Sequence, residues 1–295
     1  MTAVTTAPSL SSPASSAAPG QSTAHDDGAR TSAGTSSSLP VTFSGVGRSF
    51  PVDGGTRTVL RDVDLTVAPG EILAIVGASG CGKSTLLRAA AGLDQGFSGS
   101  VLIGEEPVRP HDHRTAMGFQ EPRLMPWRTI HQNVALGLPS RTSRSAGAEQ
   151  VDRLLELVGL SAAAGRRPRE VSGGMAQRAS LARALARRPG VLLLDEPFGA
   201  LDALTRLKMQ DLLLDIHAQT GTTVLLVTHD VDEALQLADR ILLLGSDPSD
   251  PDRPGATTRQ VLTVPGSRPR DRGSAELAAL RSSLLEGLGV DSHRH

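Results

Sequence analysis

A glycine-rich stretch, Gly77-Ala78-Ser79-Gly80-Cys81-Gly82-Lys83-Ser84 followed by Thr85, stands between two segments of predicted regular structure. It has the pattern G-x-x-x-x-G-K-[ST], in which the turn directs backbone N–H groups toward a phosphate. The apolar run 71–76 before it predicts a buried strand, and residues 83–91 after it predict a helix. Because a helix N-terminus attracts anions, we expect Lys83 to contact the β- and γ-phosphates of a nucleotide and Ser84 to bind Mg²⁺.

A pair of acids follows a second apolar run. Residues 191–194 predict a strand, and Asp195 and Glu196 come directly after them. Ligands of open α/β sheets bind at the carboxyl ends of the strands. We therefore expect Asp195 to hold Mg²⁺ through water and Glu196 to orient the attacking water. Strands commonly end in an acid, so this pair alone is a weak signal. The phosphate loop upstream makes the prediction of a nucleotide site strong.

Strands and helices alternate over the second half of the chain. Apolar runs lie at 223–227 and 241–244, with helical segments at 204–217 and 231–238. Continuous apolar runs are typical of parallel strands covered on both faces, so the alternation predicts an α/β fold. Helical spacing over about 126–188 indicates an inserted helical unit. The leucines of residues 275–288 predict a short amphipathic helix near the C-terminus.

The composition excludes several classes of protein. The chain has 295 residues and a net charge of −1, so no overall basic field is available for nucleic acid. A single cysteine excludes an internal disulfide framework and suits a reducing compartment. No apolar run approaches the ~18 residues of a membrane span, and we find no secretory signal. Residues 1–39, dominated by small and polar residues, are expected to form a disordered tail.

A second glycine-rich stretch, Val171-Ser172-Gly173-Gly174-Met175, precedes the predicted helix 175–188. Ser172 is expected to be the N-cap, and the glycines leave backbone N–H groups open to a ligand. This arrangement predicts a second phosphate site. A loop inside a helical insertion cannot fold onto the phosphate loop of its own chain.

This stretch resembles the signature motif of ABC-type ATPases, and the resemblance covers roughly residues 41–265. It extends to Gln120 (the Q-loop), Gly199-Ala200-Leu201-Asp202 (the D-loop) and His229 in Val227-Thr228-His229-Asp230 (the H-switch). The resemblance implies a P-loop NTPase core with a mainly parallel sheet, an antiparallel β subdomain and an inserted α-helical subdomain. It places the ATP-binding domain at 40–265, with a helical tail at 266–295.

In that family two copies form a head-to-tail dimer, and each ATP lies between one phosphate loop and the other copy's signature. The resemblance thus implies that Ser172, Gly173 and Gly174 bind the γ-phosphate across the dimer and that Asp202 links the two sites. Gln120 would sense Mg²⁺ and the attacking water, and His229 would contact the γ-phosphate. Phe50 occupies the place of an aromatic ring that stacks on adenine, although an ordinary strand residue is the alternative.

The residues around the Q-loop and D-loop are similar to those of importer ATPase subunits for sulfonates, taurine and nitrate. The stretches 121–127 and 201–212 and the tail 262–288 match the aliphatic sulfonate type best. This resemblance implies two permease subunits, a periplasmic or lipid-anchored substrate-binding protein, and a position on the cytoplasmic face of the membrane. Taurine, nitrate or a related small anion is the alternative substrate.

A more remote alternative is an ABC ATPase that acts on nucleic acid or ribosomes. The single phosphate loop, the lack of a heptad array and the net charge argue against it, and we expect no nucleic acid partner. Two rare residues leave a choice open. Cys81 is either a partly ionised thiol or an inert filler. Trp127 is either a core residue or an anchor for a permease helix.

Overall fold

The computed structural model describes residues 38–250 and 252–289. The expected disordered tail therefore lies almost wholly outside the described residues. The elements in chain order are β1 (Val41–Val52), β2 (Gly55–Val67), β3 (Ile72–Val76), α1 (Lys83–Ala90), β4 (Ser98–Ile103), β5 (Glu106–Pro107), β6 (Thr115–Gly118), α2 (Ile130–Ala135), α3 (Arg144–Leu157), α4 (Gly173–Ala186), β7 (Val191–Asp195), α5 (Ala203–Thr220), β8 (Thr223–Val227), α6 (Val231–Leu237), β9 (Arg240–Gly245), β10 (Thr257–Thr263) and α7 (Ala275–Gly287). Short 3₁₀ turns occupy Ser161–Ala163 and Pro168–Glu170.

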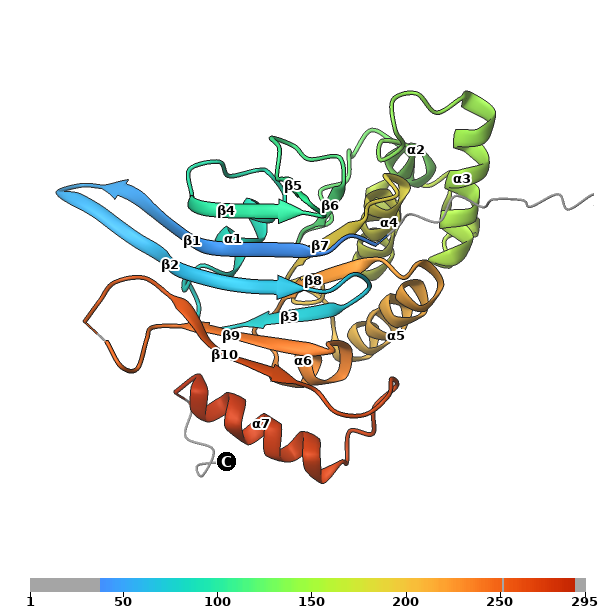
Figure 1. Ribbon diagram of the computed structural model, residues 1–295. Helices are drawn as coiled ribbons and strands as arrows, with labels where there is room; N and C mark the ends of the chain where they lie inside the picture. Colours follow the sequence, from blue (N-terminus) through green and yellow to red (C-terminus); the bar gives the residue numbers. More distant parts are fainter. Residues whose placement is uncertain (1–37, 251, 290–295) are drawn as a thin grey trace, which may run out of the picture. The chain divides into compact units, whose positions relative to one another are not determined.

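Two sheets form the framework (Figure 1). The larger has the order β10-β9-β3-β8-β7-β6, and its strands run parallel except for β10 at one edge. The smaller sheet has the order β2-β1-β4-β5 and is antiparallel. The predicted α/β class with a mainly parallel sheet and an antiparallel β unit is therefore confirmed.

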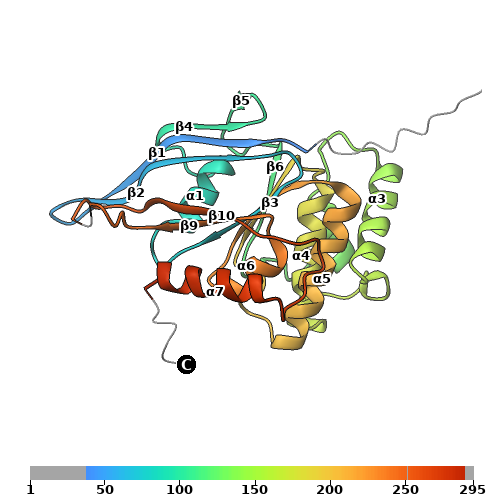
Figure 2. The ribbon, with the colours of Figure 1, turned by 60° about the horizontal axis from the view of Figure 1, so that its bottom comes forward.

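The larger sheet is buried on both faces because successive residues of a strand point to opposite sides. In β3, Leu73 and Ile75 join a core with α1 and the antiparallel sheet, whereas Ile72, Ala74 and Val76 join a second core with the remaining helices. Figure 2 shows α1 between the two sheets and the α3, α4 and α5 helices gathered to one side. The continuous apolar runs in the sequence reflect this double coverage.

Three helices begin at residues whose side chains cap their N-terminus. Ser172 caps α4, Asp202 caps α5 and Asp230 caps α6, each through a side-chain oxygen that accepts backbone N–H. In α7, Leu277 and Leu284 are buried against the core, as the leucine stripe predicts. None of the helices in the described part of the chain is long and apolar enough to span a bilayer.

Candidate nucleotide site

The phosphate loop connects β3 to α1 and requires glycine at two positions. Gly82 has a φ of 110°, which favours a residue without a side chain, and a Cβ there would lie 2.6 Å from Leu60 Cδ2. A Cβ on Gly77 would collide with the carbonyl oxygen of Leu244. Gly82 is also the N-cap of α1 and supplies no side-chain cap, so the first N–H groups of the helix are left for a ligand.

Lys83 is held inside the loop. Its side chain is buried, with the residue 6% exposed, and Nζ donates to the carbonyl oxygens of Gly77 at 2.8 Å and Ala78 at 3.1 Å. These bonds fix an ammonium group at the centre of the turn, beside the free N–H groups of the helix. The arrangement places a point charge where phosphate oxygens would bind.

Ser84 and Asp195 meet although they are 111 residues apart. Ser84 Oγ donates to Asp195 Oδ1 at 2.7 Å, which joins the first turn of α1 to the carboxyl end of β7. The two groups offer one hydroxyl and one carboxylate oxygen. Mg²⁺ prefers such oxygens and commonly takes the rest of its shell from water and phosphates, so the pair fits this ion.

Glu196 and His229 form a second pair at the carboxyl ends of β7 and β8. His229 Nδ1 lies 3.2 Å from Glu196 Oε2, with the histidine side chain 61% exposed and the glutamate 27%. Glu196 adopts a φ of 48°, an uncommon backbone conformation for this residue type, and its N–H donates to the carbonyl oxygen of Val227. A carboxylate so placed is partly open to water and oriented by an imidazole, as a water-activating base requires.

Gln120 approaches the same place from the loop after β6. A Cβ on Gly199 would lie 3.1 Å from Gln120 Nε2 and 3.7 Å from Glu196 Oε2, so both side chains border the space beside this glycine. The structure therefore brings together most of the residues predicted from one chain: the phosphate loop, Asp195, Glu196, His229 and Gln120.

The signature stretch is outside this group. Ser172 Oγ accepts the N–H of Met175 at 3.3 Å, which confirms the expected N-cap. Gly173 is exposed and has open space where its side chain would be, while a Cβ on Gly174 would contact Thr205 at 2.5 Å. The hydrogen bonds of Ser172 within the described residues stay in its own helix. Asp202 is also exposed and caps α5 through the N–H of Thr205.

Phe50 lies near the end of β1, opposite Arg57 of β2. The guanidinium of Arg48 lies 4.1 Å from the centre of its ring, and Arg48 in turn pairs with Asp94 at 2.8 Å. One face of the ring is therefore covered by a cation from its own strand.

The structure bears on the two choices that the sequence left open. Burial is the main cause that raises the pKa of the Cys81 thiol, against a smaller opposing effect of Lys83, and this favours the inert filler. Trp127 is 69% exposed, so the core interpretation was wrong.

One polar group near the H-switch was missed by the sequence analysis. Thr228 Oγ donates a short hydrogen bond to Glu233 Oε2, and burial raises the pKa of Glu233 to about 7. Asp230 of the same turn pairs with Arg206 at 3.3 Å, and Arg206 also donates to the carbonyl oxygen of Leu201 in the D-loop. The contacts of Arg206 connect the H-switch to the D-loop. The sequence signal for the buried Glu233 is an acid on an apolar helix face.

Comparison with known proteins agrees with this geometry. A family model described as ABC transporter matches residues 60–199. The chain is 50% identical over 237 residues to the aliphatic sulfonates import ATP-binding protein SsuB 1 of Xanthomonas axonopodis pv. citri, which covers 79% of this chain and 92% of that relative. It is 48% identical over 260 residues to SsuB 1 of Streptomyces avermitilis, which covers 88% of this chain and 90% of the relative.

Two solved structures share the fold. One is described as the dimeric structure of MJ0796, a bacterial ABC transporter cassette, with a TM-score of 0.65, 29% identity and coverage of 77% of this chain and 100% of that chain. The other is a dimeric post-hydrolysis state of the ATP-binding cassette MJ0796 bound to ADP and Pi, with a TM-score of 0.64 and the same identity and coverage. The chain therefore belongs to the ATP-binding proteins of the ABC transporter family.

Proposed function

We propose that this chain is the ATP-hydrolysing subunit of an importer for aliphatic sulfonates. The observation that carries the enzymatic part is the convergence of Lys83, the Ser84–Asp195 pair and the Glu196–His229 pair at one sheet edge. The substrate class comes from the printed names of relatives about half identical to this chain.

ATP binding follows from the phosphate loop. The N–H groups of residues 77–85 and the Lys83 ammonium hold the β- and γ-phosphates, and the face of the Phe50 ring opposite Arg48 stacks on adenine. Ser84, Asp195 and Gln120 would hold Mg²⁺, partly through water. When bound, this ion neutralises charge that develops on the phosphate oxygens.

Hydrolysis uses the pairs beside the loop. Glu196 accepts a hydrogen bond from the attacking water and aligns it with the γ-phosphate. His229 contacts the Glu196 carboxylate through Nδ1 and presents its other ring nitrogen to the γ-phosphate oxygens, and Gln120 borders the same water.

A second copy completes each site. Ser172 and Gly173, which are exposed, and the buried Gly174 bind the γ-phosphate held by the partner's loop. The Ser172 oxygen accepts its cap bond from Met175 and still has a proton to donate to phosphate. Asp202, in the exposed D-loop, lies at the contact between the two sites. We assign this nucleotide-binding unit to residues 40–265, with the helical subdomain at about 126–188.

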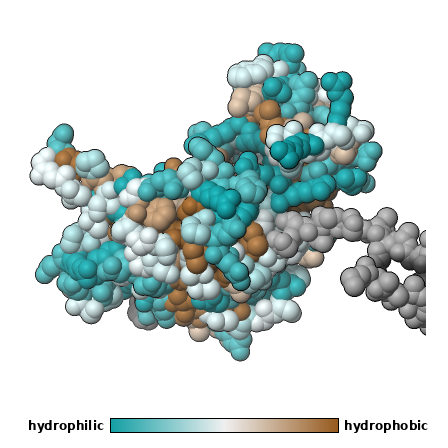
Figure 3. Space-filling view, turned by 45° about the horizontal axis from the view of Figure 1, so that its top comes forward, coloured by the Kyte–Doolittle hydropathy of each residue, from teal (hydrophilic) through white to brown (hydrophobic). Residues whose placement is uncertain are grey.

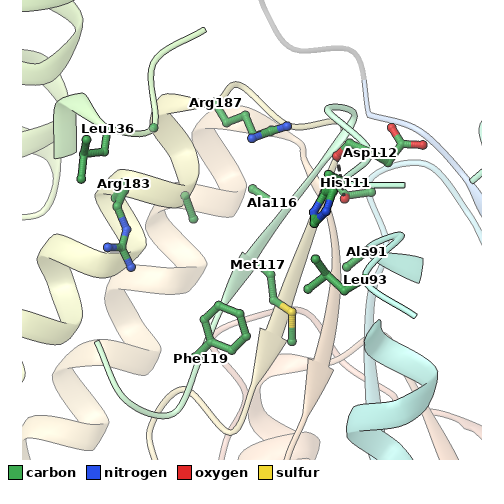
Figure 4. A pocket seen from close by; sticks show the side chains of 13 residues that line it. Ala91, Leu93, His111, Asp112, Ala116, Met117, Phe119, Leu136, Arg183 and Arg187 are labelled. Carbon is green, nitrogen blue, oxygen red and sulfur yellow. Dashed lines mark hydrogen bonds between the residues drawn. The ribbon is translucent and has the colours of Figure 1, made fainter. Parts of the chain in front are cut away.

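The permease partner has a candidate groove. Figure 4 shows it between the end of α1, with Ala91 and Leu93, and α4, with Arg183 and Arg187, and Met117 and Phe119 lie on its floor. Leu93 is 45% exposed. The space-filling view shows hydrophobic surface among hydrophilic surface on the upper face of the molecule (Figure 3). We propose that a cytoplasmic helix of one permease subunit docks here and that the second permease subunit docks in the same way on the second copy of this chain.

Trp127 follows the groove segment and is not among the residues that line the groove. Its exposure still leaves the indole available to a docked permease. Trp127→Ala is expected to leave ATP binding and folding unchanged and to reduce transport by the assembled importer. Unchanged transport would remove Trp127 from the interface.

The importer also needs a periplasmic or lipid-anchored protein that binds the sulfonate. Attachment to the permease subunits would hold this chain on the cytoplasmic face of the cell membrane. The test is deletion of the gene, followed by growth on alkanesulfonates as sole sulfur source. Growth is expected to fail and to return with the wild-type gene but not with Glu196→Gln. Normal growth of the deletion strain on alkanesulfonates, with failure on taurine, would reassign the substrate.

A further inference from the structure

Gln177 is a buried polar residue of α4 that the proposed mechanism leaves unused. It lies five residues after Ser172 on the same helix and is only 6% exposed. Its neighbours are largely apolar, with Leu181, Leu194 and Phe198 around it. A buried amide in such surroundings is costly unless its donors are satisfied.

Both protons of the Gln177 amide are used, and their acceptors belong to two different catalytic segments. Nε2 donates to the carbonyl oxygen of Phe119 at 3.0 Å and to the carbonyl oxygen of Pro197 at 2.8 Å. Phe119 immediately precedes Gln120, and Pro197 immediately follows Glu196. One side chain therefore fixes the backbone on which both water-binding residues stand.

A second residue of α4 holds the other side of the Q-loop. Arg183 donates to the carbonyl oxygens of Pro122 at 2.9 Å and Arg123 at 2.8 Å. The Q-loop is thus held by α4 before and after Gln120. Only Gln177 also reaches the segment of Glu196, so a movement of α4 moves Gln120 and Glu196 together.

We propose that Gln177 is a positioning residue that couples the signature end of α4 to Gln120 and Glu196 of the same chain. ATP that binds against Ser172 belongs to one shared site, whereas Gln120 and Glu196 serve the other. Through Gln177, occupancy of the first site sets the water geometry of the second. This inference rests on the proposed shared-site dimer and assigns to one side chain the communication between its two sites.

The chain contains a matched control. Gln150 of α3 is also 6% exposed, and its Nε2 donates to the carbonyl oxygen of Ala186 at 2.9 Å. It fixes the far end of α4 to α3 and touches neither catalytic segment. Gln177→Met and Gln150→Met each remove a buried amide with little change in volume.

The test measures ATP hydrolysis against ATP concentration for the full-length wild type and both variants, together with ATP affinity and thermal stability. Because small displacements of reacting groups are costly, Gln177→Met is expected to lower kcat by about 10- to 100-fold. Its ATP Kd is expected to stay within about twofold. Because occupancy of one site sets the geometry of the other, the wild type is expected to give a sigmoidal rate curve and Gln177→Met a hyperbolic one. Gln150→Met is expected to keep the wild-type kcat and curve shape.

Several results would overturn the inference. They are a Gln177→Met chain with wild-type kcat, a wild-type rate curve that is itself hyperbolic, or a Gln150→Met chain with an equal loss of kcat. If Gln177→Met folds poorly, Gln177→Glu keeps the side-chain length and leaves at most one of the two donors, and the loss of kcat must recur in it. A wild-type chain that neither hydrolyses ATP nor dimerises would instead defeat the proposed function, and this inference with it.

Discussion

The two glycine-rich loops of this chain have the same local design and opposite surroundings. Each joins a turn to a helix N-terminus, at 77–85 before α1 and at 171–175 before α4. The first contains a buried lysine and meets the carboxylate of Asp195, whereas in the second Ser172 and Gly173 are exposed. A helix N-terminus by itself therefore does not define a nucleotide site.

The difference lies in what packs around each loop. The phosphate loop carries its own cation, Lys83, and the Ser84 hydroxyl. It gains the Asp195 carboxylate and the water-activating pair from the ends of β7 and β8. The signature loop projects from the helical unit and gains no such partner within the described residues. The first is a binding site in a single chain, and we expect the second to act only when another copy supplies ATP.

The largest effect is expected at the catalytic carboxylate beside the first loop. Glu196→Gln keeps the size of the side chain and removes the base, so kcat is expected to fall by about 10²- to 10⁴-fold. ATP binding is expected to remain, because the phosphate contacts are intact. Phosphate release and ATP binding measured on the same preparation check this. Hydrolysis near the wild-type rate would remove Glu196 from its role.

Lys83→Arg tests whether the phosphate loop has room only for an ammonium group. The ammonium is buried and donates to two carbonyl oxygens, and a planar guanidinium does not fit the same space. The affinity of the isolated chain for ATP is expected to fall by about 10- to 100-fold, as for a lost charged hydrogen bond. Lys208, the other lysine, is exposed on α5 and gives the control Lys208→Arg. Equal affinity of both variants would contradict the account.

Ser172→Ala tests the second loop. Loss of the cap is expected to lower the free energy of unfolding by about 1 kcal/mol. ATP binding by the isolated chain should not change, whereas turnover should fall because the partner's phosphate loses a donor. Ser143 caps α3 in the same way, with Ala146 N–H at 3.3 Å, so Ser143→Ala is the matched control. Weaker ATP binding by monomeric Ser172→Ala would break the contrast between the loops.

The smallest effect concerns the thiol of the first loop. Because burial raises the pKa of Cys81, little thiolate is present at pH 7, and maleimide labelling is expected to be slow and to accelerate as pH rises. Mg-ATP is expected to slow it further. The adduct is counted by mass spectrometry with and without nucleotide. Fast labelling at pH 7 that ATP does not change would place Cys81 away from the phosphate site.

The sequence predicted those features that depend on neighbouring residues in the chain. The strand, turn and helix around Lys83 and the cap at Ser172 follow from local propensities. The parallel sheet follows from the doubly buried apolar runs. A site shared by distant residues could be inferred from the rule that ligands bind at the carboxyl ends of strands, as for Ser84 and Asp195. For Gln120 and His229 it could be inferred only from the family resemblance.

Features that depend on packing between distant segments were not predictable. The exposure of Trp127 and the burial of Cys81 are decided by what covers them, and a single sequence gives no sign of this. Gln177 shows the same limit. It stands among alanines in a helix, and its importance appears only when α4 is seen against the Q-loop and the end of β7.

The central claim is that the phosphate loop binds ATP in a single chain, whereas the signature loop acts only on ATP that a second copy holds. Full-length Glu196→Gln, which retains ATP without hydrolysis, is passed through size-exclusion chromatography with light scattering, with and without Mg-ATP. The account predicts a monomer without nucleotide, a dimer with it, and loss of the dimer when Ser172→Ala is added. A chain that binds ATP but stays monomeric, or a dimer that is indifferent to Ser172, would contradict it.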